Sequence, residues 1–285
     1  TLSKSPFHIL NMSDLTNSVH EPDAKKTKLN TASSNEKNQL LPLPATIGLE
    51  QYSFTDGVDI TPSGAMPQKK YYRSRAHANP LSFNDNLSYP KSPDAIDWRS
   101  YYSNLSGPVH PTVLDIGCGF GGLTCSLSPL LPSSRIMGME IRAKVCEYVR
   151  LRIMSLRNEG DKGTHHNAAV IRVNTMKNLL NYIAPGTLSK IFICFPDPHF
   201  KTKNHRRRIV TYDLLTEYAY VLAPGSKLYL ITDVEELHNW HVEKSDSHEM
   251  FERIPDTEAI KDPCVKLMIE TTEEGKKVER SGSNK

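Results

Sequence analysis

The sequence predicts a doubly wound α/β fold, in which helices cover both faces of a mostly parallel sheet. Two observations support this prediction. From residue 113 onward, short segments rich in β-branched residues alternate with longer segments of helical periodicity. The first strand-like segment, VLDIG, runs directly into a glycine-rich turn. In folds of this class ligands bind at the carboxyl ends of the strands, so the functional residues are expected there.

The individual elements follow from local composition. The helical pattern is clearest between residues 142 and 160, where Val145, Val149, Ile153 and Leu156 recur at steps of three and four residues. Short β-branched segments that end at glycine or proline predict strands. The predicted strands cover 113–117, 135–141, 168–174, 188–198 and 226–234, and the predicted helices cover 121–132, 142–160, 211–225 and 234–244.

Composition divides the chain into three parts. Residues 1–66 are rich in Ser, Thr and Asn and show no sustained period, which is typical of disorder. We expect a largely disordered extension there, with a fused or partner-derived segment as the alternative. Residues 67–112 form a basic, proline-punctuated lead-in, and residues 113–285 form the α/β domain.

Composition also argues against several classes of protein. The five cysteines, at 118, 125, 146, 194 and 264, form no CxxC pair, which favours reduced thiols over a disulfide framework or a zinc site. We therefore expect no metal. The chain has no apolar run long enough to span a membrane and no signal-peptide pattern, so we expect an intracellular protein without a membrane segment. The net charge of +3 is too small to identify a partner by itself.

The glycine-rich turn is the first functional motif. Asp115 ends the strand, and Gly117, Gly119, Gly121 and Gly122 lead into a helix. Glycines allow the backbone to pass close to a ligand in conformations that a side chain forbids. A dinucleotide-binding protein is the main alternative for such a turn.

Polar residues at the ends of the next two strands extend this motif. Glu140 lies about 20 residues beyond the turn, where a carboxylate suits ribose hydroxyls, and Asn174 and Thr175 follow the third strand, where an adenine ring needs hydrogen-bond partners. The spacing D-x-G-x-G-x-G-G differs from the G-x-G-x-x-G of dinucleotide sites. The set as a whole resembles class I methyltransferases, which have a Rossmann-like fold.

A second motif, FPDPHFKTKNHRRR at 195–208, ends the fourth predicted strand. Two prolines flank Asp197 and fix the backbone on either side, so its carboxylate is expected to project in a defined direction. A loop-capping role is the alternative interpretation of this residue.

Two basic clusters contain no acidic residue, which suggests a surface that binds phosphates. A solvated charged face is the simpler alternative. His199, Phe200, His205 and the pair Tyr71–Tyr72 are candidates for stacking on bases, with packing as the alternative. The basic residues are Lys69, Lys70, Arg73 and Arg75 before the fold, and Lys201, Lys203, Arg206, Arg207 and Arg208 after Asp197.

Four motifs in the same order and at similar spacing resemble the catalytic subunit of eukaryotic tRNA (guanine-N7-)-methyltransferases. They are QKKYYRSRAHANP at 68–80, VLDIGCGFGG at 113–122, FPDPHFK at 195–201 and TTEEGKK at 271–277. The resemblance implies transfer of a methyl group from S-adenosylmethionine to N7 of a guanosine in the tRNA variable loop. It also implies a heterodimer with a WD-repeat subunit and a nuclear location, with the cytoplasm as a second location.

The resemblance further assigns residues. It makes Asp197 the catalytic residue, and it implies a late segment that folds back over the site, although TTEEGKK by itself indicates only a polar turn. Asn174-Thr175 stands where an Asn-Ala pair is familiar. The implied cofactor contacts are Gly117, Gly119, Glu140, Ile141, Arg142, Asn174, Thr175, Cys194, Thr272, Glu273 and Glu274.

Two other functions remain open from the sequence. One is a methyltransferase of the same fold that acts on another RNA, a protein or a small molecule, although the basic clusters argue against a small substrate. The other is a nucleic-acid-binding scaffold with an inactive cofactor pocket, which the intact glycine turn, Glu140 and Asp197 make less favourable.

Overall fold

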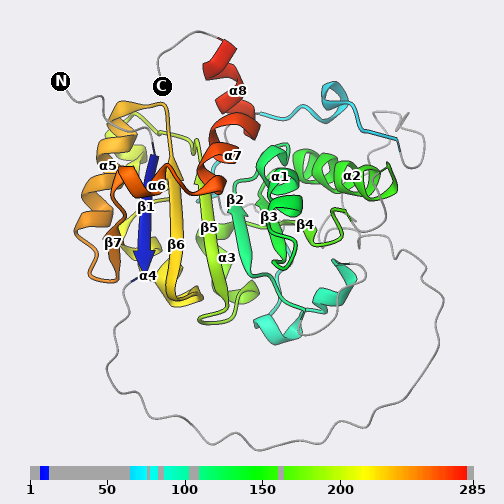
Figure 1. Ribbon diagram of the computed structural model, residues 1–285, viewed down its shortest axis with the longest axis horizontal. Helices are drawn as coiled ribbons and strands as arrows, with labels where there is room; N and C mark the ends of the chain where they lie inside the picture. Colours follow the sequence, from blue (N-terminus) through cyan, green and yellow to red (C-terminus); the bar gives the residue numbers. More distant parts are fainter. Residues whose placement is uncertain are drawn as a thin grey trace, which may run out of the picture.

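A seven-stranded sheet forms the centre of the molecule (Figure 1). The computed structural model describes residues 7–12, 65–75, 78–82, 87–102, 109–159 and 164–280. The strands lie in the order β4-β3-β2-β5-β6-β1-β7. Their bounds are β1 Phe7–Met12, β2 Val113–Ile116, β3 Ile136–Glu140, β4 Ala168–Arg172, β5 Leu188–Cys194, β6 Leu222–Ile231 and β7 Phe251–Arg253.

Helices connect the parallel strands, and all of these helices except α3, between β4 and β5, were predicted. Strands β2 to β6 pair in parallel, which confirms the doubly wound fold. The helices are α1 Gly122–Leu130, α2 Ala143–Glu159, α3 Thr175–Tyr182, α4 Tyr212–Val221, α5 Glu235–Asp246, α6 Asp256–Ala259, α7 Pro263–Thr271 and α8 Glu273–Arg280. Short 3-10 helices lie at η3 Lys69–Tyr72, η4 Pro93–Ala95, η5 Trp98–Ser100 and η6 Thr202–Arg207. No helix in the described part of the chain is long and apolar enough to cross a membrane.

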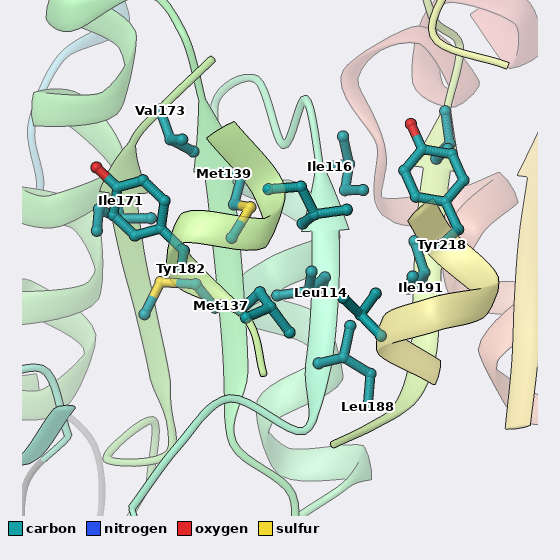
Figure 2. Packing of buried hydrophobic residues seen from close by; sticks show 14 of the residues in the cluster. Leu114, Ile116, Met137, Met139, Ile171, Val173, Tyr182, Leu188, Ile191 and Tyr218 are labelled. Carbon is teal, nitrogen blue, oxygen red and sulfur yellow. The ribbon is translucent and has the colours of Figure 1, made fainter. Parts of the chain in front are cut away.

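Alternating residues of the strands pack against two groups of helices. Leu114 and Ile116 face a cluster that includes Tyr182 of α3 and Tyr218 of α4 (Figure 2). Their neighbour Val113 belongs to a second cluster on the other face, formed with side chains of α1, α6 and α7. Because both faces of the sheet are covered, β2 and β4 are buried along their whole length rather than at alternate residues.

The strand order reverses between β2 and β5, which are neighbours in the sheet although they are far apart in the chain. The chain leaves β2 toward β3 and leaves β5 toward β6, so their carboxyl ends flank a crevice. The glycine turn follows β2 and the loop around Asp197 follows β5. The fold therefore brings the two motifs to one edge of the sheet.

The N-terminal extension, expected to be largely disordered, contains one strand that the sequence did not predict. Residues 7–12 form β1, an antiparallel strand between β6 and β7. Ile9 and Leu10 are both 1% exposed, on opposite faces of the sheet. Six residues in a polar stretch are too few to show a period, so only pairing with β6 reveals them. Residues 1–6 and 13–64 of the predicted extension lie outside the described residues.

Several helix and strand assignments also differ from prediction. Helix α3 was not predicted, because Leu179 and Tyr182 are the only apolar residues among the four that it buries. Strand β6 begins at Leu222, four residues before the predicted start, so it contains Pro224 and Gly225. The elements β7, α6 and α7 lie in a stretch for which the sequence predicted no structure.

Candidate active site

The turn after β2 provides a backbone cradle. Gly117, Gly119 and Gly121 have φ angles of 72°, 54° and 73°, in the left-handed region that favours glycine. A Cβ atom at Gly117 would meet nothing within 4 Å in the protein, so it would project into open space at the start of the turn. At the base of the turn, the buried Asp115 accepts a hydrogen bond of 2.6 Å from Thr124 Oγ1. Burial raises the pKa of the Asp115 carboxyl to about 6.

The late segment packs directly against this turn. A Cβ atom at Gly122 would overlap the carbonyl oxygen of Thr271, so the end of α7 can approach only a glycine. The predicted polar turn at TTEEGKK is instead the junction between α7 and α8. Thr272 donates its hydroxyl to Met268 O at 2.9 Å and accepts from the Gly275 backbone at 3.1 Å. These bonds hold Thr272, Glu273 and Glu274 beside the glycine turn.

Glu140, at the end of β3, is buried with 3% of its surface exposed. Its carboxylate accepts hydrogen bonds from the backbone N–H and the guanidinium of Arg142, at 2.8–3.0 Å. The side chains of Glu140 and Arg142 therefore form one unit, and a ligand that binds Glu140 also meets the guanidinium. This arrangement fixes the carboxylate at the mouth of the crevice.

Two connected cavities occupy the crevice. The larger, about 410 Å³, is lined by the glycine turn, the loop after β5 and the α7–α8 junction. The second, about 210 Å³, shares Gly117, Arg142, Cys194 and Asp197 with it and continues past Glu140. Nine of the eleven predicted cofactor contacts line one or both cavities: Gly117, Gly119, Glu140, Ile141, Arg142, Cys194, Thr272, Glu273 and Glu274.

The remaining two predicted contacts lie beside the cavities but do not line them. Asn174 is 2% exposed, and its amide donates to Pro80 O at 2.7 Å, which ties the lead-in to the end of β4. Thr175 is 6% exposed and contacts the sulfur of Met139. The neighbouring Met176 lines the second cavity instead.

Cys194 and Cys118 both line the larger cavity. Burial raises the pKa of each thiol well above its usual value. Both thiols are therefore neutral at physiological pH and serve as wall groups rather than nucleophiles.

Asp197 lies on a strained loop at the centre of the crevice. The residues before and after the Pro196-Asp197-Pro198 turn, Phe195 and His199, have φ angles of 50° and 46°. Non-glycine residues adopt such angles only where the surroundings enforce them. The Phe195 backbone donates to Ile231 O at 2.8 Å, and the His199 backbone donates to Asp197 Oδ1 at 3.4 Å. The loop thus presents the Asp197 side chain, 28% exposed, to the cavities.

Arg208 anchors the Asp197 loop through a hydrogen bond to its backbone. Its guanidinium, buried with 1% of the residue exposed, donates to Pro198 O at 2.9 Å and to Glu236 of α5 at 2.5 Å. It also lies 4.6 Å from the ring of Trp240. The interpretation of Arg208 as a phosphate contact is wrong, because a side chain buried in this way cannot reach an RNA backbone.

The other predicted basic residues differ in their exposure to solvent. Lys70, Arg73, Arg75, Lys201, Lys203 and Arg206 are exposed, and Arg207 is partly buried. Lys69 forms an ion pair with Glu273 at 2.5 Å and lies 5.3 Å from the ring of Phe120. Of the predicted basic residues, the structure therefore places Lys69, which is engaged with α8, and Arg207 beside the cavities.

Several residues that line the cavities were missed from the sequence. Asp233, just after β6, lines the larger cavity together with Phe120 and Lys277. Asp233 could have been found by the rule that singled out Glu140, because it too is an acidic residue at the carboxyl end of a parallel strand. Five acidic residues, among them Asp197, Glu273 and Glu274, line this cavity together with two basic residues, Arg142 and Lys277. Among the described residues no group of three or more His, Cys, Asp or Glu side chains is placed to hold a metal ion.

Comparison with known proteins gives consistent matches. A sequence model of a family described as "Putative methyltransferase" matches residues 109–285. Proteins named tRNA (guanine-N(7)-)-methyltransferase are similar over most of the chain. The one from Botryotinia fuckeliana (strain B05.10) is 49% identical over 247 residues, which cover 78% of this chain and 87% of that protein. The one from Yarrowia lipolytica (strain CLIB 122 / E 150) is 50% identical, covering 77% and 75%. The one from Caenorhabditis elegans is 48% identical, covering 77% and 86%.

Proposed function

Because the chain belongs to the tRNA (guanine-N7-)-methyltransferase family, we propose that it methylates N7 of a guanosine in tRNA with Asp197 beside the reacting base. The observation that supports this role of Asp197 is its position: it lines both cavities, the larger together with the glycine turn and the smaller together with Glu140 and Arg207. A cofactor and a base that fill these cavities both contact this residue.

The residues of the crevice fit S-adenosylmethionine, which supplies an electrophilic methyl group on a sulfonium when it is bound. Gly117 leaves open space that a Cβ would fill, Glu140 offers a fixed carboxylate to ribose hydroxyls, and Ile141 and Met176 give apolar walls to an adenine ring. The acidic side chains of the larger cavity suit the positive charge of a sulfonium and an α-ammonium group.

Guanine N7 carries an in-plane lone pair and needs no deprotonation, so Asp197 is not required as a general base. Its task is to place the purine and to stabilise the positive charge that the ring gains on methylation. A carboxylate can also accept hydrogen bonds from the N1–H and the exocyclic amine of guanine. No other standard base presents these two donors together. Prolines on both sides of Asp197 preorganise the carboxylate for this role.

The test compares Asp197→Asn and Asp197→Ala with the unmodified protein. We expect turnover on tRNA to fall by about 10²- to 10³-fold in both variants, as when a preorganised stabilising group is removed. Cofactor affinity, measured by calorimetry, is expected to change little. Near-normal turnover in Asp197→Asn would exclude the electrostatic role and leave Asp197 as a residue that shapes the loop.

We further propose the heterodimer with a WD-repeat subunit and the nuclear location that the family resemblance implies. Exposed apolar side chains on α3 and α4 support a docking face: Leu180 is 40% exposed, Tyr212 47% and Tyr220 56%. Copurification with a WD-repeat protein should be lost in a Tyr212→Ala/Tyr220→Ala variant whose melting temperature is unchanged. Imaging of the tagged full chain tests the location.

A further inference from the structure

A third cavity adjoins Asp197 and contains no residue of the glycine turn. Its volume is about 340 Å³, and it is lined by Ala78 and Asn79 of the lead-in, by residues 197–200 and by Arg207. It shares Asp197 and Pro198 with the larger cofactor cavity. An occupant of this third cavity therefore lies directly beside the base that Asp197 contacts.

Phe200 forms an exposed aromatic wall of the third cavity, with 64% of its surface accessible. Phe200 follows directly after His199, whose backbone has a strained φ angle of 46°. An aromatic ring that a fold holds out in solvent beside an active site offers a flat apolar surface to a ligand. A nucleobase is the ligand that such a surface suits best in an RNA-modifying enzyme.

Arg207 is a second, independent indication of a ligand. Its Nε atom is buried and has no hydrogen-bond partner in the described part of the chain, while the side chain lines both the third cavity and the cavity beside Glu140. A buried N–H that remains unpaired is unfavourable, so an acceptor from a ligand is expected at this point. Its neighbours differ, because Arg206 is exposed and Arg208 is bonded to Pro198 and Glu236.

We propose that the third cavity is a second nucleotide subsite, in which the base next to the target guanosine stacks on Phe200 and a phosphate or carbonyl oxygen accepts from Arg207. The proposal rests on the proposed function and specifies how the RNA is held. A guanosine that leaves its stack to enter the active site deprives its neighbour of a stacking partner, and Phe200 replaces that partner.

The first experiment measures tRNA affinity for Phe200→Leu and Phe200→Trp in the full chain, with S-adenosylhomocysteine present. Leucine keeps an apolar side chain but cannot stack, whereas tryptophan can. We expect about 10-fold weaker binding for Phe200→Leu, in line with the loss of one stacked base, and near-normal binding for Phe200→Trp. Equal affinities of the leucine variant and the unmodified protein, or equal losses in both variants, would overturn the proposal.

Arginine variants provide a matched control within one segment. Arg207→Ala and Arg206→Ala remove the same charge from neighbouring residues, but only Arg207 lines the cavity. We expect Arg206→Ala to weaken binding modestly and to flatten its salt dependence. Arg207→Ala should cause a larger loss that persists at high salt. Identical losses with identical salt slopes would show that Arg207 is one more surface cation and would refute its role in the subsite.

A fluorescent base locates the contact. 2-Aminopurine placed next to the target guanosine should be quenched by the unmodified protein and by Phe200→Trp, and should stay bright with Phe200→Leu. Absence of quenching by the unmodified protein overturns the proposal. If the unmodified protein binds but does not methylate tRNA, the proposed function fails; if it methylates tRNA and the Phe200 variants behave alike, only the subsite fails.

Discussion

The two loops that meet at the reversal point of the sheet are held by opposite means. The turn after β2 keeps its shape because glycine, which has no side chain, stands at the critical positions: three glycines adopt left-handed φ angles, and α7 approaches Gly122 where a Cβ would collide. The loop after β5 adopts similar angles at Phe195 and His199, which have side chains, so its shape must be imposed from outside. Arg208 imposes it through Pro198 and links it to α5. The turn after β2 is therefore sensitive to substitution of its glycines, and the loop after β5 is sensitive to removal of the Arg208 side chain.

The largest effect expected from this comparison is that of Arg208→Ala. Removal of the guanidinium frees the Pro198 carbonyl and lets the loop relax, which misplaces Asp197. A displacement of about 1 Å at a reacting group costs on the order of 10²-fold in rate, so we expect a loss of that size in kcat. The KM for the cofactor should change little, because the cofactor cavities keep their glycine turn and Glu140.

Two further variants separate positioning from general destabilisation. Arg208→Lys retains one donor and should recover part of kcat. Glu236→Gln leaves the bond from Arg208 to Pro198 and should lose less activity than Arg208→Ala, because Glu236 is half exposed and is readily replaced by water. Equal kcat in Arg208→Ala and the unmodified enzyme would show that the loop is held without this anchor.

The next prediction concerns the glycine turn, with a control from elsewhere in the chain. Gly117 and Gly186 have similar φ angles, 72° and 62°, and neither has an atom within 4 Å of an added Cβ. Alanine at either position should cost about 1 kcal/mol of stability through backbone strain. Only Gly117 lines the cofactor cavities, so Gly117→Ala should also weaken cofactor binding by about tenfold or more. Similar cofactor affinities for the two variants would contradict the hypothesis that the glycine turn binds the cofactor.

The same contrast explains what the sequence could and could not predict. The glycine turn was evident because it depends on residue types that stand together, and so was Asp197 between its prolines. The anchoring of the second loop was not evident, because Arg208 stands in a run of cations and differs from Arg206 and Arg207 only through contacts with α5. Strand β1 was missed for a related reason: its burial depends on β6 and β7, more than 200 residues away in the chain.

The family resemblance contributed residues that local patterns did not indicate. Thr272, Glu273 and Glu274 reach the cavity only because α7 packs on Gly122, a contact between segments about 150 residues apart. Asp233 was within reach of the strand-end rule but was not singled out, because a single acidic residue after a strand is common. The site residues that local sequence patterns did not indicate therefore depend mainly on packing between segments far apart in the chain.

The smallest predicted effect is a pH dependence that arises at the base of the glycine turn. Burial raises the pKa of Asp115 to about 6, so in the free protein this carboxyl stabilises the fold below its unfolded pKa and loses that contribution as the pH rises through 6. A cationic cofactor acts in the opposite direction, because it favours the ionised carboxylate. Affinity for S-adenosylmethionine should therefore fall by about 3- to 10-fold between pH 7 and pH 5, as measured by calorimetry.

Two variants make this pH dependence specific to Asp115. Asp115→Asn cannot titrate, so its affinity should be weaker at pH 7 and nearly constant down to pH 5. Thr124→Val removes the 2.6 Å hydrogen bond that lowers the Asp115 pKa, so the decline in affinity should begin at higher pH than in the unmodified protein. If Asp115→Asn keeps the full pH dependence, the titrating group lies elsewhere in the cavity, and the glycine turn contributes its shape but not this charge.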